Sequence, residues 1–176
     1  ISVSVSPQPS VSISASPYTR LLPGLNSTLT ANVTPPGTYM YVWRKNGVVI
    51  SGASAATLNV NLDQLGSYTV TVTNPGNCSN TSALVNISDS ASTKLFILPN
   101  PNSGQFDVIY YSAASNTHTL RIFDSKGAIV YSNAYPITGP YQRMSVDMRS
   151  GGKGTYVVAL FNNSGKRVAT GKVVIQ

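Results

Sequence analysis

Apolar and polar residues alternate along most of the chain, in short runs separated by Pro, Gly, Asn and Ser. Residues 1–6 alternate apolar and hydroxyl side chains, and residues 11–16 alternate again after a Pro-rich interruption. A period of two is typical of a β-strand with one buried face. No segment keeps apolar residues at helical spacing for three turns. The pattern therefore predicts an all-β protein.

The region 11–88 has short alternating strands and regularly spaced turn signals. This pattern resembles an immunoglobulin-like or polycystic-kidney-disease-like β-sandwich. Asn46-Gly47 predicts a two-residue hairpin turn, because both residues tolerate positive φ. Gly66-Ser67-Tyr68 resembles the corner that precedes a later core strand in that class. Inward-facing positions are expected at Leu29, Ala31, Val33, Tyr39, Tyr41, Trp43, Leu58, Val60 and Leu62.

Two segments are expected to lie outside the sandwiches. Residues 1–6 resemble residues 83–88, so we expect 1–10 to hold the end of a preceding repeat and a linker. Residues 89–93 are small and polar, which is typical of a domain boundary. The chain begins at Ile1 without a signal-peptide pattern, so we expect it to be the C-terminal part of a longer protein. No apolar run reaches the roughly twenty residues of a membrane-spanning helix.

The region 94–176 is predicted to form a second, seven-stranded sandwich. Two hairpins share one formula, Phe123-Asp-Ser-Lys-Gly127 and Phe161-Asn-Asn-Ser-Gly165. The polar side chain after each Phe is expected to cap its turn. Pro99-Asn100-Pro101 lacks two backbone donors, which suits a sheet edge. The strands are expected at 94–98, 105–111, 118–123, 128–132, 142–148, 155–161 and 167–175.

These motifs, in this order, resemble the C-terminal sorting domain of type IX secretion. The resemblance implies recognition by the type IX translocon and by outer-membrane shuttle and sortase-like components, in a Gram-negative bacterium of the Bacteroidota. The terminal strand is expected to be the segment that the translocon recognises, because a free end can pair with a partner's sheet edge. The other motif residues are expected to shape the surface that displays it. The residues concerned are Pro99, Asn100, Pro101, Gly104, Asp124, Gly127, Gly154, Tyr156, Gly165, Lys172, Val173, Val174, Ile175 and Gln176.

The resemblance also implies processing after export across the outer membrane. A sortase-like peptidase commonly removes such a domain, and the upstream passenger is attached to anionic lipopolysaccharide or released. Asp89-Ser90-Ala91 also resembles an acceptor sequence for O-linked sugar. The cleavage linker is expected to comprise Ser88, Asp89, Ser90, Ala91, Ser92 and Thr93.

The net charge of +7 lies mostly in the second half, where residues 91–176 include nine basic and three acidic side chains. Scattered basic residues are typical of solvated strand edges that discourage aggregation. Attraction to an acidic polysaccharide or to the export channel is the functional alternative. No basic cluster interleaves with an aromatic platform, which disfavours nucleic-acid binding. The scattered residues include Lys126, Arg143, Arg149, Lys153, Lys166 and Arg167.

Candidate chemistry is sparse, since the chain has five Asp, no Glu and one His. Asp107, Asp124 and Asp147 lack the spacing of an acid–base pair or a metal cage, so neither an enzyme nor a cofactor is predicted. His118, at a strand start, is expected to be exposed or hydrogen-bonded. Cys78 is expected to be the remaining half of a disulfide that related surface modules form.

The alternative function is adhesion or glycan binding by the pair of sandwiches. This function would require an exposed platform of aromatic side chains. Strand alternation is expected to place some of the candidate tyrosines in the core, which weakens the case. The candidates are Tyr110, Tyr111, Tyr131, Tyr135 and Tyr141.

Overall fold

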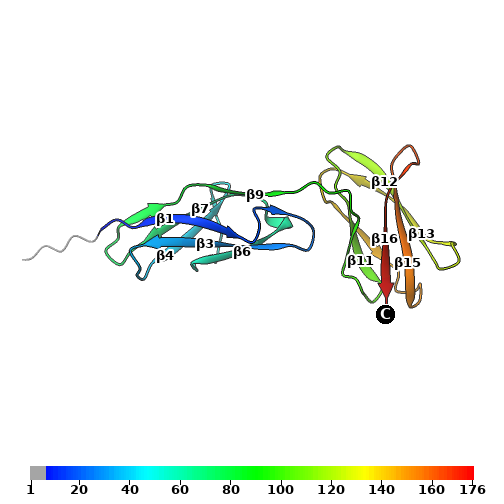
Figure 1. The fold of residues 1–176 in the computed structure, drawn as a ribbon, viewed down its shortest axis with the longest axis horizontal. Coiled ribbons are helices and arrows are strands. Elements are labelled where there is room, and N and C mark those ends of the chain that lie inside the picture. Colours follow the sequence, from blue (N-terminus) through cyan, green and yellow to red (C-terminus); the bar gives the residue numbers. More distant parts are fainter. Residues whose placement is uncertain (1–6) are drawn as a thin grey trace, which may run out of the picture. The chain divides into compact units, whose positions relative to one another are not determined.

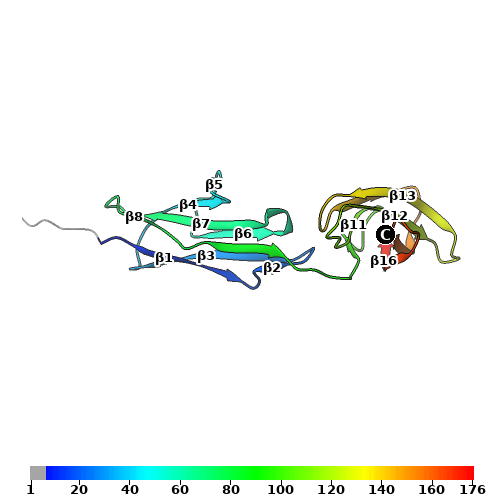
Figure 2. The ribbon, with the colours of Figure 1, turned by 90° about the horizontal axis from the view of Figure 1, so that it is seen from above.

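The computed structural model describes residues 7–176, so the strand expected over residues 1–6 lies outside the described residues. The chain divides into two compact units, Ile1–Ser90 and Ala91–Gln176. Both units consist of mainly antiparallel sheets packed face to face, with one parallel pair, β2 and β9, in the N-terminal unit, which confirms the predicted all-β class with tandem sandwiches (Figure 1, Figure 2). Within the described part, no helix is both long and apolar enough to cross a membrane.

The described part of the N-terminal unit, residues 7–90, contains two sheets. One sheet has the order β1 (Ser10–Ser16), β3 (Asn26–Thr34), β6 (Thr57–Asn61). The other has the order β2 (Arg20–Leu21), β9 (Val85–Asp89), β7 (Gly66–Thr73), β4 (Met40–Lys45), β5 (Val48–Val49), with β8 (Ser79–Thr81) also paired to β7. A single 3₁₀ turn, η1 (Leu62–Gln64), follows β6.

The core of this unit follows the predicted alternation. Trp43 is fully buried, and its indole N–H donates to the Ala55 carbonyl at 2.8 Å. A buried indole needs such an acceptor, because an unpaired polar group in the core is costly. Asn46 and Gly47 both have positive φ, which confirms the predicted hairpin turn between β4 and β5. Buried residues of the core are Leu21, Leu29, Ala31, Trp43, Val60, Tyr68, Val70, Val72 and Ile87.

The C-terminal unit forms all seven predicted strands. A three-stranded sheet has the order β10 (Phe96–Leu98), β11 (Gln105–Ile109), β14 (Arg143–Asp147). A four-stranded sheet has the order β13 (Ile129–Ile137), β12 (Asn116–Phe123), β15 (Gly154–Phe161), β16 (Arg167–Ile175). The core between them includes Phe106, Val108, Leu120, Ile122, Met144, Val146, Val158, Leu160 and Val173.

The environment of His118 differs from the expectation of an exposed or hydrogen-bonded side chain. His118 is 4% exposed, and its Nδ1 has no hydrogen-bond partner among the described residues. Strand β12 begins at Asn116, two residues earlier than predicted, so His118 lies within the strand and not at its exposed start. His118 therefore shares the inward face of the strand with Leu120 and Ile122. Its ring centroid lies 6.0 Å from that of Tyr110.

Candidate functional site

The outer edge of the terminal strand β16 is held by the side chain of Asn100. The Asn100 amide nitrogen donates to the Lys172 carbonyl at 2.9 Å, and its Oδ1 accepts from the Val174 amide at 2.9 Å. One side chain thus makes the pair of bonds that a neighbouring strand would make with this edge. The peptide bonds that precede Pro99 and Pro101 are both cis.

Asn102 continues the same edge through its backbone. Its amide donates to the Val174 carbonyl at 3.0 Å, and its carbonyl accepts from the Gln176 amide at 2.9 Å. We call Asn100 and Asn102 together the asparagine clamp. The clamp occupies four successive polar groups of the strand end Lys172–Gln176. This end is therefore not a free edge in the folded unit, unlike the expectation from the sequence.

The segment between Asn102 and β11 is fixed by hydrogen bonds at Gly104. The Asn102 Oδ1 accepts from the Gly104 amide at 2.7 Å, and the Gly104 carbonyl accepts from the Met148 amide at 2.7 Å. Gly104 has a φ of +100°, and an added Cβ would lie 2.8 Å from the backbone of Arg149. No side chain fits at this position without a backbone shift. Asn102 was not singled out as a site residue from the sequence, although its alternation with Asn100 was a visible signal.

The two predicted turns at Asp124 and Asn162 are the same structure. The Asp124 Oδ1 accepts from the amides of Lys126 and Ala128, each at 2.9 Å. The Asn162 Oδ1 accepts from the amides of Ser164 at 3.1 Å and Lys166 at 2.9 Å. Both side chains cap their turns, as the sequence formula predicted. Gly127 and Gly165 close the turns with positive φ.

A related turn occurs in the N-terminal unit. The Asn74 Oδ1 accepts from the Cys78 amide at 2.9 Å, and Asn77 takes the positive-φ position. Cys78 therefore lies in a turn that its own backbone helps to close. A turn capped by an Asp or Asn side chain thus occurs in hairpins of both units.

The Gly-x-Tyr motif also occurs in both units. Tyr156 is buried and its hydroxyl donates to the carbonyls of Gly151 and Gly152, the latter at 3.0 Å. Tyr68 is buried in the same way and its hydroxyl donates to the Gln64 carbonyl. The glycines two residues before these tyrosines have φ of +153° at Gly154 and +151° at Gly66. Both corners join a loop to a core strand, as in immunoglobulin-like sandwiches.

The segment expected to be a cleavage linker is divided between the units. Ser88 and Asp89 belong to β9 and pair with Arg20 and Leu21 of β2. The Ser90 amide donates to the Leu21 carbonyl at 2.9 Å. The remaining residues, 91–93, lie in the C-terminal unit and line a shallow pocket together with Lys94, Tyr110 and Tyr111.

The five candidate platform tyrosines form separate contacts. Tyr141 is buried, and its ring packs edge-on against Tyr111 at a centroid distance of 5.3 Å. The hydroxyls of Tyr131 and Tyr135 form a hydrogen bond of 2.7 Å, and the Tyr135 hydroxyl donates to the Ser145 carbonyl at 2.6 Å. Burial, with the contact to Tyr131, raises the pKa of Tyr135 to about 12. Tyr110, Tyr131 and Tyr135 pack against the core.

The carboxylates of this unit have local structural partners. Asp107 accepts from Arg143 at 3.2 Å and from the Ser145 hydroxyl at 2.7 Å. Asp147 accepts from the Arg149 guanidinium at 2.6 Å. The hydrogen bonds from Arg149 lower the pKa of Asp147 to about 2. Residues 7–176 contain no group of three or more His, Cys, Asp or Glu placed to hold a metal ion.

Comparison with known structures finds similar β-sandwich proteins. The human OSCAR ligand-binding domain is 20% identical with a TM-score of 0.36, over 98% of this chain and 100% of that one. The fibronectin(III)-like modules of Clostridium thermocellum CbhA are 11% identical with a TM-score of 0.39, over 95% and 94%. Murine CEACAM1b is 12% identical with a TM-score of 0.38, over 95% and 99%. A comparison with curated proteins finds no significant match.

Comparison with protein families is more specific. Residues 96–176 match the family described as the secretion system C-terminal sorting domain. This range begins at β10 and includes the asparagine clamp, both capped turns of the four-stranded sheet and the Gly154 corner. Domains of this family mark proteins that type IX secretion exports to the cell surface or the extracellular space. The C-terminal unit of this chain therefore belongs to the type IX C-terminal sorting domain family, which makes the chain a cell-surface or secreted protein.

Proposed function

We propose that the type IX translocon recognises the C-terminal unit as a folded sandwich and carries the chain across the outer membrane. The family match over residues 96–176 is the observation that carries this proposal. Outer-membrane shuttle and sortase-like components would then act on the same unit. The N-terminal unit would serve as a spacer between this signal and an upstream passenger.

We propose that the translocon recognises the terminal strand of the unit, Lys172–Gln176. The asparagine clamp occupies its outward backbone groups at residues 172, 174 and 176. Pairing with a partner strand there would require the clamp to open. Lys172 and Gln176 have exposed side chains on the strand. We therefore propose that the docked strand is read through its side chains, and that the clamp holds it in position.

The processing site is a further part of this proposal. Ser88, Asp89 and Ser90 are bonded to β2 or its flank, whereas residues 91–93 belong to no strand. A peptidase binds its substrate in an extended form, so a segment outside the sheets is more accessible. We place the cut in Ala91–Thr93. The passenger, with the N-terminal unit, would then be attached to anionic lipopolysaccharide or released.

The test is export of a reporter fused before residue 1 of the whole chain. The host is a bacterium with a working type IX system, and the measurement is the exported fraction of the reporter. We expect export of the wild type and loss of export when Lys172–Gln176 is deleted. Asn100→Ala should reduce export, whereas Asn163→Ala, an exposed asparagine outside the clamp, should not.

Each outcome of this test separates one part of the proposal from another. A wild-type fusion that stays in the periplasm, while a known sorting domain is exported, would overturn the sorting function. Normal export of the deletion variant would keep that function but move recognition away from the terminal strand. Equal export of the two asparagine variants would show that the clamp is dispensable. The length of the surface-exposed product would locate the cut.

A further inference from the structure

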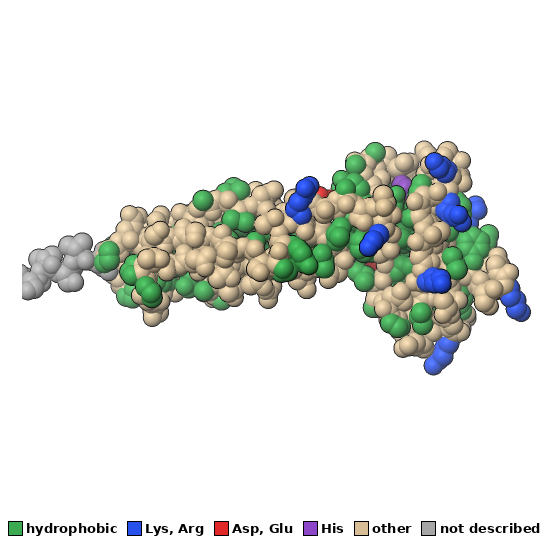
Figure 3. Space-filling model, in the orientation of Figure 1, with side chains coloured by type: hydrophobic (Ala, Val, Ile, Leu, Met, Phe, Trp, Pro, Cys, Tyr) green, Lys and Arg blue, Asp and Glu red, His purple; other side chains and the backbone are tan. Residues whose placement is uncertain are grey.

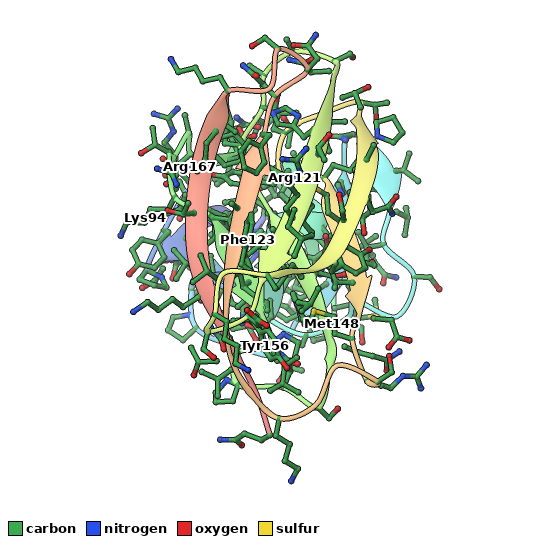
Figure 4. All side chains as sticks on the ribbon, turned by 90° about the vertical axis from the view of Figure 1, so that its right-hand side faces the viewer. Lys94, Arg121, Phe123, Met148, Tyr156 and Arg167 are labelled. Carbon is green, nitrogen blue, oxygen red and sulfur yellow. The ribbon has the colours of Figure 1, made fainter. Side chains whose placement is uncertain are left out.

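The outer face of the four-stranded sheet carries an exposed apolar row. In the strand register, Ile129 of β13 lies opposite Phe123 of β12, and Phe123 lies opposite Val157 of β15. Ile129 is 55% and Val157 is 40% exposed, and Phe123 is partly exposed. Figure 4 looks onto this sheet, with Phe123 and Arg121 labelled on β12. Three apolar side chains thus form one row across three strands.

The charges on this face are basic. Lys172 of β16 lies opposite Val157 and extends the apolar row. Arg121 lies in the next row, opposite Ala159, and its guanidinium stacks 4.9 Å from the ring centroid of Phe161. Arg167 of β16 lies opposite Phe161. Figure 3 shows Lys and Arg side chains spread over this unit, in agreement with its nine basic and three acidic residues.

Arg121 has no carboxylate partner among residues 7–176. The ion pairs found there join Arg143 to Asp107 and Arg149 to Asp147, on the three-stranded sheet and at its end. The acidic group at the turn of the four-stranded sheet, Asp124, accepts from backbone amides of its own turn. An arginine held over an aromatic ring is ordered in advance for a bidentate acceptor.

Exposed apolar residues that occur singly are normal on protein surfaces, whereas a contiguous row beside a positioned charge is typical of an interaction surface. The inward residues of the same strands fill the core. The outward row is only partly covered by its own unit. A partner that covers this row must supply apolar surface, and charge complementarity requires it to place an acidic group opposite Arg121.

We infer that the Arg121 face, defined by Phe123, Ile129, Val157, Arg121 and Phe161, docks a protein surface of the export machine that is apolar at its centre and carries a carboxylate opposite Arg121. This inference rests on the proposed sorting function. A lipid surface fits the face less well, because Arg121 lies beside the apolar row on the same face, and insertion of that row into hydrocarbon would bury the guanidinium without a partner. A protein can cover the same face and pair the charge.

The experiment uses the reporter fusion of the whole chain with substitutions on this face. Charge reversal in Arg121→Glu places like charges together, so we expect the exported fraction to fall at least about tenfold. Arg121→Gln and Val157→Thr should each reduce export several-fold. Lys153→Glu makes the same charge change in an exposed loop, and Val48→Thr makes the same apolar change in the N-terminal unit. Both controls should be exported as the wild type is.

The outcomes are separable from those of the sorting function itself. Wild-type export together with normal export of Arg121→Glu and Val157→Thr overturns the inference and leaves the sorting function intact. Thermal unfolding of each purified variant shows whether a loss of export reflects misfolding. If Arg121→Glu does not fold, export of Arg121→Gln tests whether the charge of Arg121 is needed. In a vesicle assay with anionic lipopolysaccharide, cosedimentation of the wild type that Arg121→Glu abolishes would overturn the protein partner in favour of a membrane surface.

Discussion

Gly104 lies where the segment after Pro101 turns back into β11, and its surroundings leave no room for a side chain. Its φ is +100°, and an added Cβ would lie 2.8 Å from both the amide nitrogen and the Cα of Arg149. We expect Gly104→Ala to lower the free energy of unfolding of the C-terminal unit by about 3 kcal/mol, through backbone strain and overpacking. Denaturant unfolding would measure this change.

Gly139→Ala is the matched control, because an added Cβ there has no heavy atom within 4 Å and the backbone is not in the left-handed region. We expect its free energy of unfolding to stay within about 0.5 kcal/mol of the wild type. Equal destabilisation by the two substitutions would contradict the role given to the close approach at Arg149.

His118 should make the stability of the C-terminal unit depend on pH near neutrality. Burial lowers the pKa of this side chain, the one histidine of the chain. In the unfolded chain its imidazole binds a proton near the ordinary pKa of about 6.5, whereas in the folded unit it does so at lower pH. The unfolded state therefore binds more protons below about pH 6.5, and folding stability decreases as the pH falls.

The measurement is the midpoint of thermal unfolding of the C-terminal unit at pH 7.5 and pH 5.0. The wild type should unfold at a lower temperature at pH 5.0. His118→Leu, which keeps an apolar side chain among Leu120 and Ile122, should lose most of this difference. A wild-type midpoint that is the same at both pH values would refute the assignment.

At the scale of strands and turns, the sequence predicted those features whose partners lie close together along the chain. Asp124 and Asn162 cap turns that close within four residues, so their formula could be recognised from local residues. The start of β12 was less predictable, because Asn116 and Thr117 are polar and give no apolar alternation. Because the strand was expected to start at His118, this side chain was expected to be exposed or hydrogen-bonded at a strand end, whereas it lies buried within the strand.

The asparagine clamp could not be predicted in this way. Asn100 bonds to Lys172 and Val174, more than seventy residues away in the sequence. Nothing in the local pattern around Asn100 identifies the strand whose edge it occupies. The sequence predicted that Pro99-Asn100-Pro101 lies at a sheet edge, and the structure shows which edge it closes.

Hydrogen exchange of the terminal strand tests the clamp directly. The Val174 amide points outward to Asn100, whereas the Val173 amide points to β15 by strand alternation. Asn100→Ala removes the acceptor of the Val174 amide, so we expect its exchange to accelerate at least about tenfold, as for a lost bond of about 1.4 kcal/mol. Exchange at Val173 should change much less. Equal acceleration at both amides would mean that the whole strand detaches.

At the scale of the whole molecule, the chain has two cores that share no residue. Its single tryptophan, Trp43, lies in the core of the N-terminal unit. Tryptophan fluorescence should therefore report the unfolding of that unit alone. Circular dichroism should report both units, because both consist of strands.

Leu120→Ala should separate the two transitions. Leu120 is fully buried in the C-terminal core, and its truncation should cost that unit about 3 kcal/mol. We expect the circular dichroism transition of the C-terminal unit to move to lower denaturant while the fluorescence transition stays in place. A shift of the fluorescence transition by the same amount would mean that the units unfold as one cooperative system.

Two motifs of the sorting domain also occur in the N-terminal unit, and this affects how sorting domains should be recognised in other genomes. A capped turn and a Gly-x-Tyr corner occur in the N-terminal unit as well, so a search pattern built on them would also retrieve ordinary sandwich modules. Pro7-Gln8-Pro9 imitates the proline spacing, but the Gln8 side chain makes one bond, to the Ser79 carbonyl. The two asparagines that close the last strand are the positions to which a discriminating pattern should give most weight.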